Sequence, residues 1–290
     1  MFTKKYTSKD IYLLNKYLNK FKKEVNNNSI DYIFKTKNYT ITIYKNKTLL
    51  IQGKMYENIL KMIDSQDEHV SVNNNIKISK NIIGSDEVGT GDTFGGIIVC
   101  ACYINEKDLN LIKTFGITDS KKLDNKSIIE LFNKIQNIIE YEVINLSPQE
   151  YNDLYQKYKN LNIIKTFGHY YATKNLINRL KFNDFTCIID QFTPINKYKD
   201  YLKQINESPN GKEITEVKAE SKYIQVATAS IVARYFFIKQ LNALSQKAKF
   251  NIPFGSSTNL IRTTIKKINE NKLSIYEFAK THFKEIKNNT

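Results

Sequence analysis

The sequence predicts an α/β protein that carries a smaller α+β unit at its N-terminal end. Three observations lead to this fold class. Beyond residue 80, short apolar, β-branched runs alternate with segments of helical periodicity, as in proteins that pack helices on a sheet. Before residue 53, polar and apolar residues alternate as they do in a hairpin. The chain has 290 residues, the length of about two ordinary domains, and its 41% of hydrophobic residues excludes wholesale disorder.

The N-terminal elements are expected in the order helix, hairpin, helix. Residues 9–23 place their apolar side chains at the spacing of one helical face, with lysines on the other. Residues 39–44 alternate as a strand, and after a short turn of lysine and asparagine, residues 48–52 return as a second strand. Residues 55–64 again have helical spacing. Together these elements predict a small α+β unit.

A polar stretch over residues 65–75 ends in three consecutive asparagines and is typical of a linker. We therefore expect one domain over residues 1–75 and a second over residues 76–290. Lysines outnumber acidic side chains in the first domain, which suits contact with phosphate groups across its sheet. A solvated, lysine-rich domain that only packs on its neighbour is the alternative interpretation.

The second domain is expected to begin with two strands. Residues 81–87 and 95–104 are apolar, β-branched runs on either side of a glycine-rich turn, which indicates adjacent strands of a buried sheet. Helical periodicity follows at 125–139, 148–158 and 165–182. Residues 185–189 are a further buried strand, residues 221–244 are a long helix with small side chains, and two short outer helices complete the chain.

The cysteines and histidines argue against a structural zinc site. Cys100, Cys102 and Cys187 each lie in an apolar run, so we interpret them as buried thiols. The three histidines are scattered along the chain and complete no zinc-ligand pattern. Any metal must therefore be held by oxygen atoms.

No stretch approaches the roughly 18 consecutive apolar residues of a membrane span, and the first residues do not form a signal peptide. We therefore expect a cytoplasmic protein that has no membrane partner, with a monomer as the default state.

The formal net charge of +15 points to a polyanionic partner such as nucleic acid or an anionic membrane surface. Only Arg179, Arg234 and Arg262 are arginines among the 44 basic residues. Lysine is a point charge suited to phosphate, whereas the reading of base edges favours the forked guanidinium. A sequence-specific DNA reader is therefore disfavoured. Compositional drift toward lysine, asparagine and isoleucine is the alternative explanation of the charge.

Glycine is concentrated in one short segment. Five of the 10 glycines fall between residues 84 and 96, which marks a backbone that bends sharply or lets a ligand come close. No Gly-Lys-Ser/Thr follows, so the segment is not a Walker A loop. The acidic residues ahead of the glycines would repel a phosphate unless cations intervene, so we expect metal-mediated phosphate contact here.

Acidic side chains stand at the ends of several predicted elements. Asp86 and Glu87 directly follow an apolar run, where two carboxylates are costly unless a hard cation compensates. Consecutive strand residues point to opposite faces, so either the glycine turn distorts the strand end or Glu87 acts partly through its backbone. Asp190 ends the strand 185–189. Glu220 stands just before the long helix, where a helix N-terminus stabilises a negative side chain in any case.

Four motifs occur in a characteristic order. They are Gly84-Ser85-Asp86-Glu87-Val88-Gly89-Thr90-Gly91-Asp92, Asp119-Ser120-Lys121-Lys122-Leu123, Ile189-Asp190-Gln191-Phe192, and Lys218-Ala219-Glu220-Ser221 with the segment Val226 to Arg234 after it. In this order they resemble ribonuclease HIII, of the type 2 ribonuclease H family. The N-terminal helix-hairpin-helix is similar to that family's extra substrate-binding domain, whose fold is like that of the TATA-binding protein.

The resemblance implies a ribonuclease H-like α/β core with a mixed sheet flanked by helices. It implies endonucleolytic cleavage of the RNA strand of RNA–DNA hybrids, with 3′-hydroxyl and 5′-phosphate ends. The residues that it assigns to Mg²⁺ or Mn²⁺ binding are Asp86, Glu87, Asp190 and Glu220. Two divalent ions about 4 Å apart would neutralise these carboxylates and clamp the scissile phosphate.

We expect the remaining substrate contacts on two segments. The backbone of Gly89, Thr90 and Gly91 would approach the sugar, where a 2′-hydroxyl can be sensed. Ser120 and Lys121 are candidates for holding a flanking phosphate.

Two alternatives stay open. A glutamate at position 220 and Gly-Thr-Gly at 89–91 favour type HIII over type HII, which usually has aspartate, a Gly-Arg/Lys-Gly turn and no N-terminal domain. A ribonuclease HII-like enzyme that cuts at single embedded ribonucleotides is one alternative, and a non-catalytic nucleic-acid-binding protein is the other. The departures from the family pattern, Gly96 in place of proline and Tyr170 in place of asparagine, lie in neighbouring segments rather than among the acidic residues.

Overall fold

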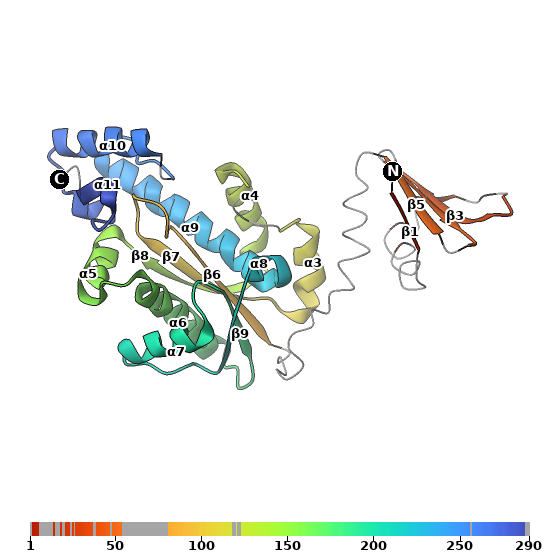
Figure 1. The fold of residues 1–290 in the computed structure, drawn as a ribbon, viewed down its shortest axis with the longest axis horizontal. Coiled ribbons are helices and arrows are strands. Elements are labelled where there is room, and N and C mark those ends of the chain that lie inside the picture. The colour runs from red at the N-terminus through yellow and green to blue at the C-terminus, as the bar shows by residue number, and fades with distance from the viewer. Residues whose placement is uncertain are drawn as a thin grey trace. The chain divides into compact units, whose positions relative to one another are not determined.

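The computed structural model describes residues 2–5, 14, 18, 21–23, 25, 27–36, 39–46, 48–53, 81–117, 120, 123–255 and 257–287. The chain divides into two compact units, Met1–Lys77 and Ile78–Thr290 (Figure 1), and each is described by itself. The predicted boundary at residue 75, the helix over residues 55–64 and the linker lie outside the described residues and stay predictions.

The described part of the first unit is a five-stranded antiparallel sheet in the order β1-β5-β4-β3-β2. Its strands are β1 (Phe2–Lys5), β2 (Lys22–Lys23), β3 (Ile30–Lys35), β4 (Tyr39–Tyr44) and β5 (Thr48–Gly53). β4 and β5 form the predicted hairpin, with Ile41 opposite Ile51. Leu14 and Leu18 are helical and buried in one cluster with the sheet. The prediction of a helix as far as residue 23 is wrong at its end, because β2 pairs with β3 there.

The second unit is built on a mixed five-stranded sheet in the order β10-β9-β6-β7-β8. Its strands are β6 (Ile82–Val88), β7 (Ile97–Tyr103), β8 (Glu140–Leu146), β9 (Thr186–Asp190) and β10 (Lys212–Glu216). The predicted strands β6 and β7 are antiparallel neighbours, and β6 runs parallel to β9, so β6 and β9 end at the same edge of the sheet. The sequence analysis missed β8 and β10, because edge strands carry polar and charged residues that hide the pattern of a buried strand.

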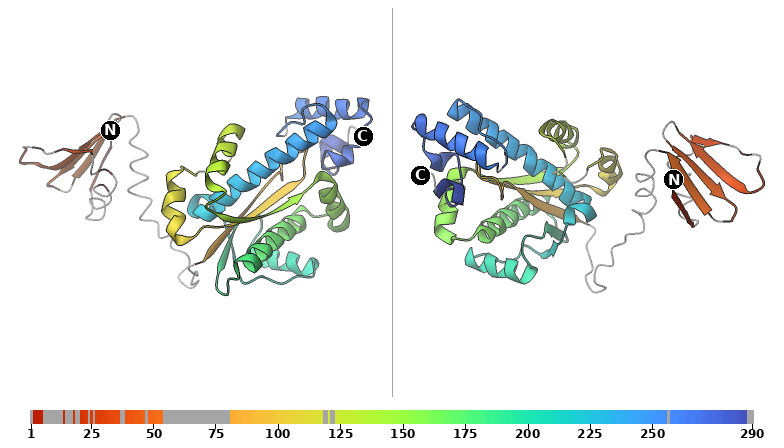
Figure 2. Two further views of the ribbon diagram at one scale, coloured as in Figure 1. Left: turned by 180° about the vertical axis from the view of Figure 1, so that it is seen from behind. Right: turned by 45° about the horizontal axis from the view of Figure 1, so that its top comes forward.

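Helices cover both faces of this sheet (Figures 1 and 2). They are α3 (Leu109–Thr114), α4 (Asn125–Ile135), α5 (Pro148–Tyr158), α6 (Leu161–Leu180), α7 (Ile195–Gln204), α8 (Ala219–Lys222), α9 (Ile224–Ala248), α10 (Thr258–Glu270) and α11 (Lys284–Lys287), with short 3-10 helices at Glu106–Asp108 and Ile275–Glu277. α9 lies along one face and α6 along the other (Figure 2). In β7, Cys100 and Cys102 belong to the apolar core under α9, whereas Val99 and Ala101 belong to clusters on the α6 side.

The approach of α9 to the sheet is close. A Cβ at Gly84 of β6 would lie 2.3 Å from the backbone of Gln225, so only glycine allows this packing. The predicted long helix begins at Ile224 rather than at residue 221. Tyr223 has an extended backbone, with φ −123° and ψ 115°, which separates α9 from α8. Glu220 therefore lies inside the short helix α8, and its predicted place just before the long helix is corrected.

The three cysteines are free and buried, as the sequence analysis predicts. Among the described residues, no helix combines the length and apolarity needed to span a bilayer.

Candidate active site

Asp86 and Glu87, near the C-terminal end of β6, point to opposite faces of the sheet. This is the ordinary alternation of a strand, so the glycine turn does not rotate the two carboxyls to one side. Asp86 lies on the α9 side, where Ser230 is near its carboxyl. Glu87 lies on the α6 side, within hydrogen-bond distance of His169.

Both carboxylate oxygens of Glu87 are held by partners on α6. Lys165 Nζ lies 2.7 Å from Oε1, and His169 Nε2 lies 2.9 Å from Oε2. His169 is fully buried, and its Nδ1 lies 2.6 Å from the Ser85 hydroxyl. Burial raises the pKa of Glu87, but the hydrogen bond and charge of His169, together with those of Lys165, outweigh it and lower the pKa to about 2. Glu87 is therefore ionised at neutral pH and engaged by these two side chains.

Asp190 and Glu220 join Asp86 on the α8 and α9 side of the sheet. Asp190 ends β9, and its Oδ1 accepts a hydrogen bond of 2.9 Å from the Ala219 N–H. Burial raises the pKa of Asp190 to about 6; the Ala219 bond opposes this rise, and the hydrogen bond and charge of Glu220 add to it. Burial, and then the charges of Glu87 and Asp190, raise the pKa of Asp86 to about 8. These carboxyls thus form one mutually repelling group.

The chemistry of this group suits a divalent cation. Glu220 Oε2 is buried and has no hydrogen-bond partner among the described residues. A cation beside it would satisfy that oxygen and relieve the repulsion, and carboxylate oxygens are the ligands that Mg²⁺ and Mn²⁺ prefer. In the part of the chain that the structure describes, no set of three or more His, Cys, Asp or Glu side chains is already arranged to coordinate an ion. Asp86, Asp190 and Glu220 are therefore neighbours that do not yet form a coordination shell.

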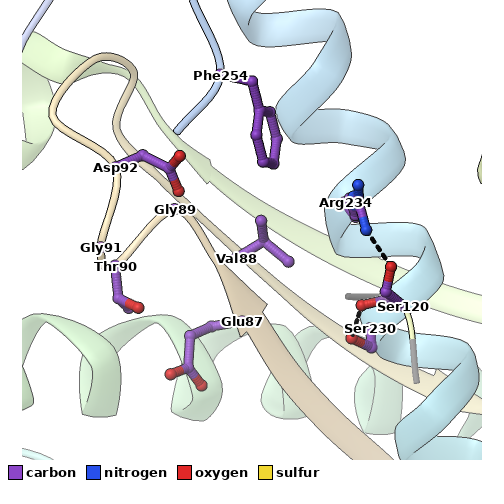
Figure 3. Close-up of a pocket in the computed structure, with 10 residues that line it drawn as sticks. All are labelled: Glu87, Val88, Gly89, Thr90, Gly91, Asp92, Ser120, Ser230, Arg234 and Phe254. Atoms are coloured by element: carbon purple, nitrogen blue, oxygen red, sulfur yellow. Dashed lines mark hydrogen bonds between the residues drawn. The ribbon is translucent and has the colours of Figure 1, made fainter. Parts of the chain in front are cut away.

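A pocket of about 310 Å³ opens at the end of β6, where Glu87 and Val88 line it (Figure 3). Its lining consists of Glu87, Val88, Gly89, Thr90, Gly91, Asp92, Ser120, Ser230, Arg234 and Phe254. Gly89 has φ +99°, and a Cβ there would lie 2.6 Å from the Gly96 carbonyl, so the turn requires glycine. The structure brings the predicted substrate residues 89–91 together with Ser120, and Lys121 lies outside the described residues.

Lys280 holds the glycine turn in place through hydrogen bonds, a role that was not predicted from the sequence. Its side-chain nitrogen is buried and donates to the Asp92 carbonyl at 2.6 Å and to the Gly95 carbonyl at 2.9 Å. The backbones are also joined, because Gly95 N donates to Phe278 O and Lys280 N donates to Thr93 O, each at 2.9 Å. The C-terminal segment therefore fixes the shape of the turn.

The sequence analysis also missed four helical residues at the site: Lys165 and His169 on α6, and Ser230 and Arg234 on α9. The two members of each pair are four residues apart, so they lie one helical turn apart on the same side of their helix. In the sequence, each pair is marked by two polar residues at helical spacing within a helix that is mostly buried.

Two neighbouring central strands of the mixed sheet end in carboxyls, and a long helix packs on the same side. This arrangement is that of the ribonuclease H-like class of nucleases. Residues 83–286 match the family model described as Ribonuclease HII. Residues 2–74 match the model described as Domain of unknown function (DUF3378).

Within that class, the chain belongs to the ribonuclease HIII family. Ribonuclease HIII of Phytoplasma mali is 41% identical over 270 residues, which cover 91% of this chain and 88% of that protein. Ribonuclease HIII of Ureaplasma parvum is 34% identical and covers 89% of this chain and 88% of its own. The crystal structure of Bst-RNase HIII in complex with Mn²⁺ is 25% identical, with a TM-score of 0.69 and coverage of 99% of this chain and 97% of that one. Aquifex aeolicus RNase H3 is 26% identical, with a TM-score of 0.57 and coverage of 97% and 99%. The predicted family and fold class are confirmed.

Proposed function

We propose that this chain is a metal-dependent endoribonuclease that cleaves the RNA strand of RNA–DNA hybrids. The main supporting observation is that Asp86 and Asp190 lie at the ends of the neighbouring parallel strands β6 and β9, with Glu220 near Asp190, in a member of the ribonuclease HIII family. A glycine-lined pocket follows at the end of β6. These three carboxyls would hold Mg²⁺ or Mn²⁺, and the Mn²⁺ complex of Bst-RNase HIII supports this choice of metal. Divalent ions bound there would neutralise the carboxylates and would supply the activation of a water molecule for attack on the phosphate.

The protein's own groups orient these carboxyls. The Ala219 N–H donates to Asp190, and Ser230 lies near Asp86. Glu87, the fourth predicted ligand, lines the pocket and has both carboxylate oxygens engaged by Lys165 and His169. Its role as a metal ligand stays a prediction. The products of the reaction are proposed to carry 3′-hydroxyl and 5′-phosphate ends.

The pocket is proposed to receive the substrate. The backbone of Gly89, Thr90 and Gly91 lines it and can sense a 2′-hydroxyl. Ser120, with Lys121, is proposed to hold a flanking phosphate. The unit over residues 1–75 is proposed to hold the hybrid as well, and its strand β2 exposes Lys22 and Lys23 to solvent. The cytoplasmic location and the monomeric state stay predictions.

Asp190→Asn tests the proposed chemistry. Asparagine keeps an oxygen that can accept from the Ala219 N–H but removes the negative charge, so the fold should persist while cation binding weakens. We expect hybrid cleavage in Mg²⁺ to fall about 100-fold or more, while fluorescence anisotropy shows that hybrid binding persists. Asp200→Asn, on the exposed surface of α7, is the matched control. Undiminished turnover by Asp190→Asn would refute the assignment.

A second substrate enters the same assay because the catalytic unit matches a model named for ribonuclease HII. A labelled duplex with a single embedded ribonucleotide is compared with a continuous hybrid, each with Mg²⁺, Mn²⁺ or a chelator. We expect faster cleavage of the continuous hybrid. Preferential cutting at the single ribonucleotide would assign the type HII activity instead, and binding without cleavage in either metal would leave a non-catalytic nucleic-acid-binding protein.

A further inference from the structure

Two residues of α9 hold Ser120 at the wall of the pocket. The hydroxyl oxygens of Ser120 and Ser230 lie 2.7 Å apart, and both side chains are buried. The Arg234 guanidinium donates through one nitrogen to the Ser120 carbonyl and through another to Asn125 Oδ1, at 3.3 Å for the latter. Figure 3 shows Arg234 and Ser230 on successive turns of α9, with Ser120 beside them and joined to each by a dashed line. Ser120 is therefore fixed through both its side chain and its backbone.

Ser230 also links this contact to Asp86. Its hydroxyl lies near the Asp86 carboxyl as well as 2.7 Å from the Ser120 hydroxyl. Either hydroxyl of the Ser120–Ser230 pair can be the donor, so Ser120 can keep its own hydrogen for a phosphate. Ser230 is therefore next to both a proposed phosphate contact and a carboxyl that is proposed to bind metal.

The forked shape of the guanidinium group explains why position 234 carries arginine rather than lysine. The chain uses arginine at only three of its 44 basic positions. Arg179 shows the same use of several nitrogens, since it donates to the carboxylates of Glu140 and Glu142 and to the Tyr141 carbonyl. A lysine ammonium is a single point and cannot span the Ser120 carbonyl and Asn125 in the same way. Arg234 thus acts as a fork that joins the Ser120 segment to α4.

We propose that Ser230 and Arg234 are positioning residues of the nuclease site. They hold Ser120 at a fixed distance from Asp86, so that a phosphate of the hybrid bound at Ser120 sets the cleaved bond opposite the metal-binding carboxyls. The proposal rests on the proposed nuclease function. It assigns the two residues different effects, because Arg234 reaches the substrate through Ser120, whereas Ser230 also contacts Asp86.

Arg234→Lys tests the first effect. The substitution leaves the net charge unchanged, so the general attraction of the protein to nucleic acid is preserved. We expect the KM for a labelled RNA–DNA hybrid to rise about five- to tenfold, the equivalent of one lost hydrogen bond, with kcat within about twofold. Arg262→Lys, on the exposed side of α10, is the matched control and should leave both constants unchanged. Equal KM values for the two variants would overturn the role of Arg234.

Ser230→Ala tests the second effect. We expect kcat to fall about tenfold, and Ser230→Thr, which restores a hydroxyl, to recover most of it. The kcat of the double variant with Ser120→Ala should be no lower than that of Ser230→Ala alone, because both substitutions remove the same hydroxyl pair. Its KM should be higher, because Ser120 is proposed to hold a phosphate. Additive losses in kcat, or a kcat equal to that of the unsubstituted protein, would overturn the role of Ser230.

Mn²⁺ titration followed by electron paramagnetic resonance gives a readout that needs no cleavage. Ser230→Ala should bind Mn²⁺ about threefold or more weakly, and Arg234→Lys should bind it normally. If the two residues had a purely structural role, both variants would have a lower melting temperature. The two variants would then also show the same Mn²⁺ affinity and the same changes in KM and kcat. If Ser230→Ala lowers the melting temperature, Ser230→Cys keeps the volume and repeats the measurement. Absence of cleavage by the unsubstituted protein would contradict the nuclease function, while the Mn²⁺ comparison would still decide the role of Ser230.

Discussion

Asp86 and Glu87 are adjacent in β6, but they face opposite sides of the sheet, and their carboxyl groups therefore have different pKa values. Asp86 faces α9, where burial raises its pKa to about 8, so without a cation it takes up a proton near neutral pH. Glu87 faces α6, where His169 and Lys165 keep its pKa at about 2 against the effect of burial. In an exposed loop, an aspartate and a glutamate would have similar pKa values and would lose their protons over the same pH range. The sheet therefore makes Glu87 an ion-pair partner of α6 and leaves Asp86, which is proposed to bind metal, without such a partner.

Glu213 on β10 gives a pH-dependent prediction at the same scale. Burial raises its pKa from 4.5 to about 7, and its Oε2 has no hydrogen-bond partner among the described residues. Because the pKa is higher in the folded state, its contribution to stability is fully present below pH 4.5 and is lost as the pH rises through 7. Glu213→Gln should therefore gain thermal stability relative to the unsubstituted protein between pH 5 and pH 8.

Melting temperatures of the two proteins across that pH range provide the measurement. Other carboxyls titrate in both proteins, so their difference isolates Glu213. Glu270→Gln, at the exposed end of α10, is the control for the loss of one negative charge. Parallel curves for Glu213→Gln would contradict the expected protonation.

At the scale of elements, the packing of α9 on β6 sets the geometry of the site. The helix carries Ser230 and Arg234, the strand carries Asp86, and Gly84 is the point of closest approach between the two elements. Gly84→Ala would place a Cβ 2.3 Å from backbone atoms of Gln225 and Val226, which cannot move as a side chain can. We expect a loss of about 2 kcal/mol or more in the free energy of unfolding, measured by urea denaturation, together with lower activity.

Gly91→Ala is the matched control, because a Cβ at Gly91 meets no atom within 4 Å. Its stability should stay close to that of the unsubstituted protein, whatever it does to substrate binding. A Gly84→Ala protein as stable as Gly91→Ala would show that α9 can shift without cost.

At the scale of the whole molecule, the two units are expected to divide the work between binding and catalysis. All the residues of the candidate active site lie in the second unit, Ile78–Thr290. Removal of residues 1–75 should therefore raise the Kd for the hybrid about tenfold or more, since one of two linked binding modules is lost. It should leave kcat at saturation within about twofold.

Anisotropy with a labelled hybrid in chelator measures the affinity, and a salt series measures the phosphate contacts that are lost with the lysine-rich unit. Circular dichroism of the shortened protein checks that the second unit still folds. Unchanged affinity would mean that the N-terminal unit has another role.

The sequence by itself determined the elements whose pattern is local. The periodicity of neighbouring residues predicts the strands around the glycine turn, the hairpin of the first unit and the long helix α9. It also predicts which acids stand at the ends of these elements. The charged edge strands β8 and β10 and the break at Tyr223 were not legible, because contacts with the rest of the fold override local preference there.

Only the tertiary structure decided which residues surround the acids. His169 reaches Glu87 across 82 positions of the chain, and Ser230 reaches Ser120 across 110. No periodicity in either segment encodes such a meeting, because it depends on how α6 and α9 pack on opposite faces of one sheet. The sequence thus placed carboxylates at strand ends, and the packing of the two helices assigned each of them its partner and its charge.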